Sequence, residues 1–298
     1  MLRLKKGAAR ITLLFLFLVS AGLIYAIKFH PQIQQTHLEK ITLRVGILPS
    51  GDANSLIEEA SPLFRYISKK LNVNYELIIP ESYAEATQIF QQRKIDVAHL
   101  GGAGFLKVHH ESDAIPLAMS DHATHFQTAF IISGRSTAKD IQELKEKRFC
   151  FGPKLSSTGH IMARRDLEEK GINPETFFNS VSHTDSHHAS VLQIINGHAD
   201  ICAVNSDIVI TMFQNDQLSS QQVRVLWKSK PFHDDVWVAQ HHLDEKFIQQ
   251  LQKLLLELNY GDLEHREILD KFASKAFVPI DLSNFEETEI YAQKYNVF

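Results

Sequence analysis

The sequence predicts an α/β fold, and three observations lead to this prediction. Residues 41–102 alternate between short apolar runs and amphipathic stretches, which is the pattern of strands connected by helices. A similar alternation returns over residues 149–207. The chain has 298 residues, of which 44% are hydrophobic, so it can bury a sizeable core as one two-lobed protein or as two small domains.

Apolar runs that stop at Pro or Gly predict three strands in the first segment, at residues 41–48, 73–79 and 95–100. Ser61 as a cap and Pro62 at the first helical position predict a helix that runs to Leu71. The capping box that begins at Ser82 predicts a second helix to about Arg93. This order favours a largely parallel sheet.

The remaining elements are expected from the same signals. Strands are predicted at residues 149–151, 201–204 and 223–227, and a charged helix at residues 138–147, while residues 128–132 form an apolar segment that leads out of the first lobe. Asn173 and Pro174 cap a short helix, and residues 244–258 carry a leucine-rich stripe at helical spacing. Helical pieces are expected at residues 267–272 and 284–295.

Two polar turns begin helices in the second alternating segment. The first reads Ser156-Ser157-Thr158-Gly159, and the second reads Thr184-Asp185-Ser186-His187, before a helix from about residue 188 to 197. Backbone N–H groups and hydroxyls at a helix start converge on one spot, and the helix dipole makes that spot attractive to anions. From the turns alone, two interpretations stay open: a pocket for a small oxyanion, or simple capping by Ser156 and Ser186.

Three segments follow one another in a characteristic order after Phe151: residues 156–159, residues 185–188, and residues 199–204 with Asp207 just beyond. In order and spacing they resemble the substrate-binding proteins of phosphonate, phosphite and phosphate ABC importers. The resemblance covers nearly all of the chain after about residue 41.

It implies a periplasmic-binding-protein type II fold, which is α/β with two lobes, each a mostly parallel sheet flanked by helices. A two-segment hinge would join lobe 1, residues 41–127 and 234–298, to lobe 2, residues 128–233.

The resemblance also implies a ligand site. Ser156, Ser157 and Thr158 match a turn whose hydroxyls and amides hold the phosphoryl oxygens, and His187 matches a histidine that donates to the same oxygens. Tyr83 matches a tyrosine that reaches into the cleft from the first lobe. The alternatives are a surface position at a helix start for His187 and helix packing for Tyr83.

Phe105 falls where many members of the family have a tyrosine, so one phosphoryl contact is in doubt and a more apolar group is expected there. Asp207 and Asp235 match acidic positions that face the amino end of an aminoalkyl phosphonate. If both line the pocket, an amine-bearing phosphonate is favoured over bare phosphate. The alternatives are that Asp207 caps a helix and that Asp235 lies on the surface of the hinge.

Composition and motifs argue against other function classes. The net charge of −4 leaves no basic footprint for nucleic acid, and no motif of a nucleophile elbow, zinc protease or P-loop is present. We therefore predict no catalytic residue and no cofactor. Sixteen histidines keep a metal-binding receptor as an alternative, but they are scattered, so no metal site is predicted. Cys150 and Cys202 are expected on neighbouring strands, either bonded or free.

Residues 1–28 have the pattern of a targeting segment, in which a basic start precedes the apolar run 11–27. It is either a signal peptide or a retained membrane anchor. The anchor is favoured because the run is close to the ~17-residue minimum for spanning. Residues 29–40 then form a linker. The basic end stays in the cytoplasm, so the rest is expected in the periplasm, tethered to the cytoplasmic membrane.

We therefore expect a non-catalytic extracytoplasmic solute-binding protein that closes on a phosphonate-, phosphite- or phosphate-type oxyanion and presents it to an ABC permease. The alternatives are a membrane-anchored ligand sensor that acts on a signalling partner and a metal-binding receptor.

Overall fold

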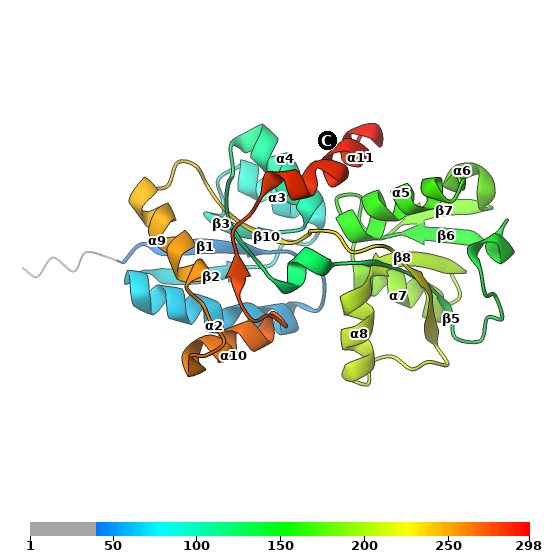
Figure 1. The fold of residues 1–298 in the computed structure, drawn as a ribbon, viewed down its shortest axis with the longest axis horizontal. Coiled ribbons are helices and arrows are strands. Elements are labelled where there is room, and N and C mark those ends of the chain that lie inside the picture. Colours follow the sequence, from blue (N-terminus) through cyan, green and yellow to red (C-terminus); the bar gives the residue numbers. More distant parts are fainter. Residues whose placement is uncertain (1–39) are drawn as a thin grey trace, which may run out of the picture. The chain divides into compact units, whose positions relative to one another are not determined.

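Two β-sheets organise residues 40–298, the part of the chain that this computed structural model describes (Figure 1). The predicted targeting segment and all but the last residue of the predicted linker lie outside the described residues. Within residues 40–298, no helix combines the length and the apolar character that a membrane crossing requires.

The first sheet has six strands in the order β11-β4-β10-β3-β1-β2. Four of its strands precede the second sheet along the chain and two follow it. They are β1 (Thr42–Ile47), β2 (Asn74–Ile78), β3 (Val97–Leu100) and β4 (Ile115–Ser120), then β10 (Val236–Ala239) and β11 (Phe277–Val278). β1 pairs in parallel with β2 and β3, as predicted. β10 pairs antiparallel with β3 and β4, because it returns from the second sheet in the opposite direction, so this sheet is mixed.

The second sheet has five strands in the order β7-β6-β8-β5-β9. They are β5 (Thr128–Ser133), β6 (Arg148–Phe151), β7 (Ser180–His183), β8 (Ile201–Asn205) and β9 (Val223–Lys228). β6 is parallel to β7 and β8, whereas β5 is antiparallel to β8 and β9. Cys150 and Cys202 lie opposite each other on the neighbouring strands β6 and β8, and neighbouring strands were predicted for them. Both are buried, and they form no disulfide.

Helices cover both faces of each sheet, and the alternation of side chains along the strands explains why. On β10, Trp237 and Ala239 face the core under α2 (Ala53–Leu71), α9 (Glu245–Leu256) and α10 (Leu263–Lys271). Val236 and Val238 face the opposite core, under α3 (Tyr83–Gln91) and α4 (Gly102–Ser112) (Figure 1). The second sheet is covered by α5 (Met162–Glu169) on one face and by α7 (His187–Ile195) and α8 (Ser206–Gln214) on the other. Residues 40–298 also contain α6 (Pro174–Phe177) and α11 (Glu286–Lys294).

Several elements were not predicted, and three differences affect helices near the first sheet or the second. α2 begins at Ala53, where the Asp52 side chain accepts hydrogen bonds from two backbone N–H groups, so Ser61 and Pro62 lie inside the helix and do not start it. The predicted charged helix at residues 138–147 is only a 3₁₀ turn, Ile141–Leu144. Helix α4 begins at Gly102, directly after the third predicted strand, where no helix was predicted.

Candidate functional site

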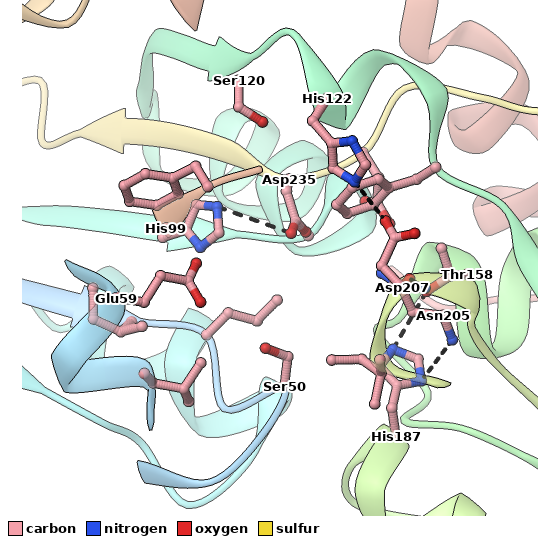
Figure 2. A pocket seen from close by; sticks show the side chains of 18 of the residues that line it. Ser50, Glu59, His99, Ser120, His122, Thr158, His187, Asn205, Asp207 and Asp235 are labelled. Carbon is pink, nitrogen blue, oxygen red and sulfur yellow. Dashed lines mark hydrogen bonds and ion pairs between the residues drawn. The ribbon is translucent and has the colours of Figure 1, made fainter. Parts of the chain in front are cut away.

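A cavity of about 170 Å³ is lined by residues from segments of both sheets (Figure 2). Its walls include the residues that follow β1, β3 and β8 and the turn after β6, so it lies at the carboxyl ends of parallel strands, where α/β sheets commonly bind ligands. Seven of the eight predicted site residues line it: Tyr83, Ser156, Ser157, Thr158, His187, Asp207 and Asp235. The eighth, Phe105, is fully buried elsewhere and packs edge-on against Phe285, with ring centroids 5.3 Å apart.

Hydroxyls and an imidazole gather at one end of the cavity. The Ser156 hydroxyl accepts a hydrogen bond from the Gly159 N–H at 2.9 Å, so it caps the turn as the simpler interpretation proposed. It also lies 3.3 Å from the Thr158 hydroxyl and 3.2 Å from His187 Nε2, while Thr158 Oγ1 lies 3.3 Å from the same nitrogen. All three side chains are buried. Capping and a polar ligand-facing cluster therefore coexist in one turn.

The protonation of His187 follows from its second ring nitrogen. Nδ1 accepts the backbone N–H of Asn205 at 3.2 Å, so it carries no proton. Burial lowers the pKa of His187 to about 4, so the ring is neutral near pH 7. A neutral ring with an unprotonated Nδ1 carries its proton on Nε2, and His187 therefore presents an N–H donor to the hydroxyl cluster.

The turn approaches His187 this closely because residue 159 is glycine. A Cβ at Gly159 would lie 2.8 Å from Cε1 of His187 and 3.0 Å from Cα of Gly152. The backbone N–H of Gly152 donates to the carbonyl of Gly159 at 2.8 Å, which closes the turn against the end of β6.

Tyr83, at the start of α3, brings a third kind of donor to this end of the cavity. Its ring meets that of His187 edge-on, with centroids 6.1 Å apart. Burial, together with the charges of Asp235 and Asp234, raises the pKa of Tyr83 well above its usual range, so the phenol keeps its proton. The hydroxyl end of the cavity therefore consists of neutral donors.

Carboxylates line the cavity as well, and we refer to them together as the carboxylate end. One of them, Asp234, accepts a hydrogen bond from the Ser157 hydroxyl at 3.0 Å. Asp234 and Asp235 are consecutive, and both line the cavity together with Asp207 and Glu59. Asp235 has a φ of 48°, in the left-handed region that Asp tolerates better than most residues. We infer that this turn of the chain just before β10 brings two neighbouring side chains to one cavity, because in an extended strand they would point to opposite faces.

Burial controls the ionisation of these acids. It raises the pKa of Glu59 to about 7, against the pull of Lys271, and it raises the pKa of Asp235 well above its usual range, with the neighbouring Asp234 as the next cause. Lys271 is the only Lys or Arg among the described residues that line the cavity.

Two histidines accompany the carboxylates. His122 Nε2 lies 2.9 Å from Asp207 Oδ2, and the hydrogen bond to this carboxyl raises the pKa of His122 (Figure 2). His99 Nε2 lies 3.9 Å from Asp235 Oδ2, and burial lowers the pKa of His99 to about 4, so this ring is neutral. Within residues 40–298, no three His, Cys, Asp or Glu side chains come together in a way that could hold a metal ion.

Sequence reasoning missed several residues of the cavity. Asp234 directly precedes a residue that was predicted, and His99 lies on a predicted strand, so both were within reach of the sequence argument. Glu59 belongs to the first half of α2, which was not recognised as helix. The missed residues with ionisable side chains are Glu59, His99, His122, Asp234 and Lys271.

Comparison with known proteins connects this geometry to a family. Residues 45–285 match the family model described as ABC transporter, phosphonate, periplasmic substrate-binding protein. A probable ABC transporter phosphite binding protein, PhnD1 of Prochlorococcus marinus (strain MIT 9301), is 24% identical over 292 residues, which cover 94% of this chain and 97% of that protein.

Solved structures show the same fold. The structure of PhnD1 from Prochlorococcus marinus in complex with methylphosphonate has a TM-score of 0.80 and 24% sequence identity, and the match covers 86% of this chain and 99% of that one. A binding protein component of an ABC phosphonate transporter from Pseudomonas aeruginosa, PA3383, has a TM-score of 0.77 at 16% identity, over 87% of this chain and 88% of that one.

Proposed function

Because the chain belongs to the periplasmic substrate-binding proteins of phosphonate ABC transporters, we propose that its cavity selects a phosphonate that also carries an amino group. The protein is a non-catalytic solute-binding protein of an ABC importer, as the sequence predicted, and its family implies a small ligand and a permease partner. The α/β fold of two sheets flanked by helices likewise matches that of the family. What we add is the assignment of the two ends of the cavity.

The hydroxyl end suits the oxyanion. Ser156, Thr158, His187 and Tyr83 offer neutral O–H and N–H donors without the strong attraction of a guanidinium, so an oxyanion can bind and also leave. A dianion gains little there, because no fixed positive charge contacts this end among the described residues.

The carboxylate end suits an ammonium group, and the presence of both neutral donors and carboxylates in one cavity is the observation that carries the proposal. Asp207, Asp235 and Glu59 share the cavity with one lysine. An ammonium placed among them favours their ionised forms and offsets the cost of burying them. A second anionic group would be repelled.

We further propose that the cavity opens and closes by a hinge between residues 41–127 with 234–298 and residues 128–233. The six-stranded sheet is built from the first set and the five-stranded sheet from the second, which supports this division. Retention of residues 1–28 as a membrane tether also remains a proposal, which rests on the sequence pattern alone.

Titration calorimetry of the purified protein with methylphosphonate and 2-aminoethylphosphonate tests the ligand assignment. We expect at least about tenfold tighter binding of the amine-bearing ligand, which is ~1.4 kcal/mol. Asp207→Asn should remove most of this difference and leave methylphosphonate binding nearly unchanged.

A matched pair of serine variants tests the oxyanion end. Ser156→Ala should weaken both ligands, whereas Ser186→Ala, which removes the corresponding cap of α7 outside the cavity, should weaken neither. Equal affinity for the two phosphonates in the unmodified protein would refute the proposed role of the carboxylates.

A further inference from the structure

The hydroxyl of Ser157 is directed differently from those of Ser156 and Thr158. Its Oγ donates to Asp234 Oδ1 at 3.0 Å and accepts the backbone N–H of Ala103 at 3.0 Å. Ser157 follows β6 of the five-stranded sheet, whereas Ala103 and Asp234 adjoin β3 and β10 of the six-stranded sheet. Ser157 is fully buried, and its hydroxyl proton is already donated to Asp234.

Asp234 completes the N-terminus of α4. The N-cap of this helix is Gly101, which has no side chain to accept a hydrogen bond, so α4 cannot cap itself. The Asp234 carboxylate instead accepts the backbone N–H of Gly102. A carboxylate that is only 3% exposed thus gains a helix N-terminus and a hydroxyl as partners, which offsets the cost of burying it.

The packing at this point leaves no spare room. A Cβ on Gly102 would lie 3.0 Å from Asp234 Oδ1 and 3.1 Å from Ser157 Oγ. The backbone N–H of Asp234 also donates to the carbonyl of Ala123 at 3.0 Å, which ties this residue to the segment between β4 and β5. Three other segments that are distant in sequence therefore meet at Asp234.

We propose that Ser157, Asp234 and the N-terminus of α4 form a junction that positions the oxyanion turn against the six-stranded sheet. In this assignment Asp234 is a positioning residue, and Ser157 holds the junction together and does not contact the ligand. The proposal rests on the proposed function, because it assumes that Ser156, Thr158 and His187 contact the oxyanion.

The junction predicts a change in the ligand-free protein, which a ligand contact would not produce. Spin labels at Glu58 of α2 and Gln214 of α8 are suitable, because both residues are exposed and their helices line different parts of the cavity. The two native cysteines are fully buried and stay unlabelled in the folded protein. Pulsed electron spin resonance then measures the distance between the two helices.

We expect Ser157→Ala and Asp234→Ala to shift or broaden the ligand-free distance distribution, whereas Ser156→Ala and Ser186→Ala leave it unchanged. The two junction variants should also weaken methylphosphonate and 2-aminoethylphosphonate by the same factor, about tenfold, since they alter the position of the turn and not one contact. Asp234→Asn keeps an acceptor oxygen and should shift the distances least.

A second kind of variant tests the junction without removing a polar group, in case Ser157→Ala or Asp234→Ala fails to fold. Gly102→Ala places a methyl group against Asp234 and Ser157, and it should shift the distances in the same direction as Ser157→Ala.

An unchanged distribution in Ser157→Ala and Gly102→Ala, with weaker binding in Ser157→Ala, would make Ser157 a ligand contact and overturn the junction. If Ser156→Ala and His187→Ala leave the binding of every oxyanion unchanged, the proposed function fails instead, whatever the distances show.

Discussion

Ionisation of the Glu59 carboxyl should make the affinity for the ligand depend on pH. Burial raises the pKa of this carboxyl to about 7, so the group gains its negative charge as the pH rises through neutrality. We expect the affinity for 2-aminoethylphosphonate to increase between pH 6 and pH 8, because ionised Glu59 then attracts the ammonium. Calorimetry over this range checks it, with methylphosphonate as the control for titration of the phosphonate itself. A rise that persists in Glu59→Gln would assign the titration to another group.

Gly159 determines how closely the turn approaches His187. In Gly159→Ala the new methyl group would meet Cε1 of His187 at 2.8 Å, so the imidazole or the turn must move. We expect a loss of about 1–3 kcal/mol in the free energy of unfolding, as for other overpacked sites, and weaker binding of every phosphonate. Denaturant unfolding and calorimetry measure the two effects. Gly51→Ala is the control, because a Cβ there meets nothing within 4 Å; equal losses in both variants would contradict the steric argument.

Two residues, Asp52 and Ser61, could each act as the N-cap of helix α2, and the structure shows that Asp52 does so. Asp52 accepts hydrogen bonds from the backbone N–H groups of Asn54 and Ser55, both at 3.1 Å, whereas the Ser61 hydroxyl donates to the carbonyl of Ile57 within the helix. We expect Asp52→Ala to cost about 1 kcal/mol of stability and Ser61→Ala to change it little. Urea unfolding of the two variants checks this. A larger loss in Ser61→Ala would show that residues 53–60 contribute little to the helix.

At the scale of elements, the sequence predicted strands better than helix starts. Strands β1, β6 and β8 were predicted to within about two residues, because their apolar runs stop at Pro, Gly or polar residues. The start of α2 was predicted nine residues too late, since Pro at an N1 position is a stronger sequence signal than Asp52. The N–H that Pro62 lacks is nevertheless tolerated inside this helix. α4 was missed because glycines at its start resemble a turn, and its cap comes from Asp234, 132 residues away.

For the whole molecule, the cavity predicts that a ligand stabilises both sheets together, because residues near each of them line it. The chain has two tryptophans, Trp227 on β9 and Trp237 on β10, so each sheet carries one fluorescent reporter. In the single-tryptophan variants Trp227→Phe and Trp237→Phe, a ligand at 100 times its dissociation constant should add ~2.7 kcal/mol to each unfolding transition. Stabilisation seen only by Trp227 would mean that the ligand contacts the five-stranded part alone.

The arrangement of the whole molecule explains which residues of the cavity could be predicted from the sequence. The hydroxyl end comes from two turns and from Tyr83 at the start of α3, all of which resemble parts of a known family, so Ser156, Thr158, His187 and Tyr83 were predicted from the sequence. The carboxylate end is assembled from α2, β3, the turn after β4, α8 and the segment before β10, and no local pattern marks Glu59, His99 or His122 as neighbours. Such neighbours become visible only when strand order and crossings are known.

The two cysteines face each other across parallel strands at the centre of the five-stranded sheet, and both are fully buried. Burial raises the pKa of Cys202 well above its usual range, so its thiol is unreactive where it lies. An alkylating reagent reaches the pair only after β6 and β8 separate. The thiols are therefore a built-in probe of local opening in this sheet. Their rate of modification in native buffer measures how often the centre of the sheet opens, without denaturant and without any added label.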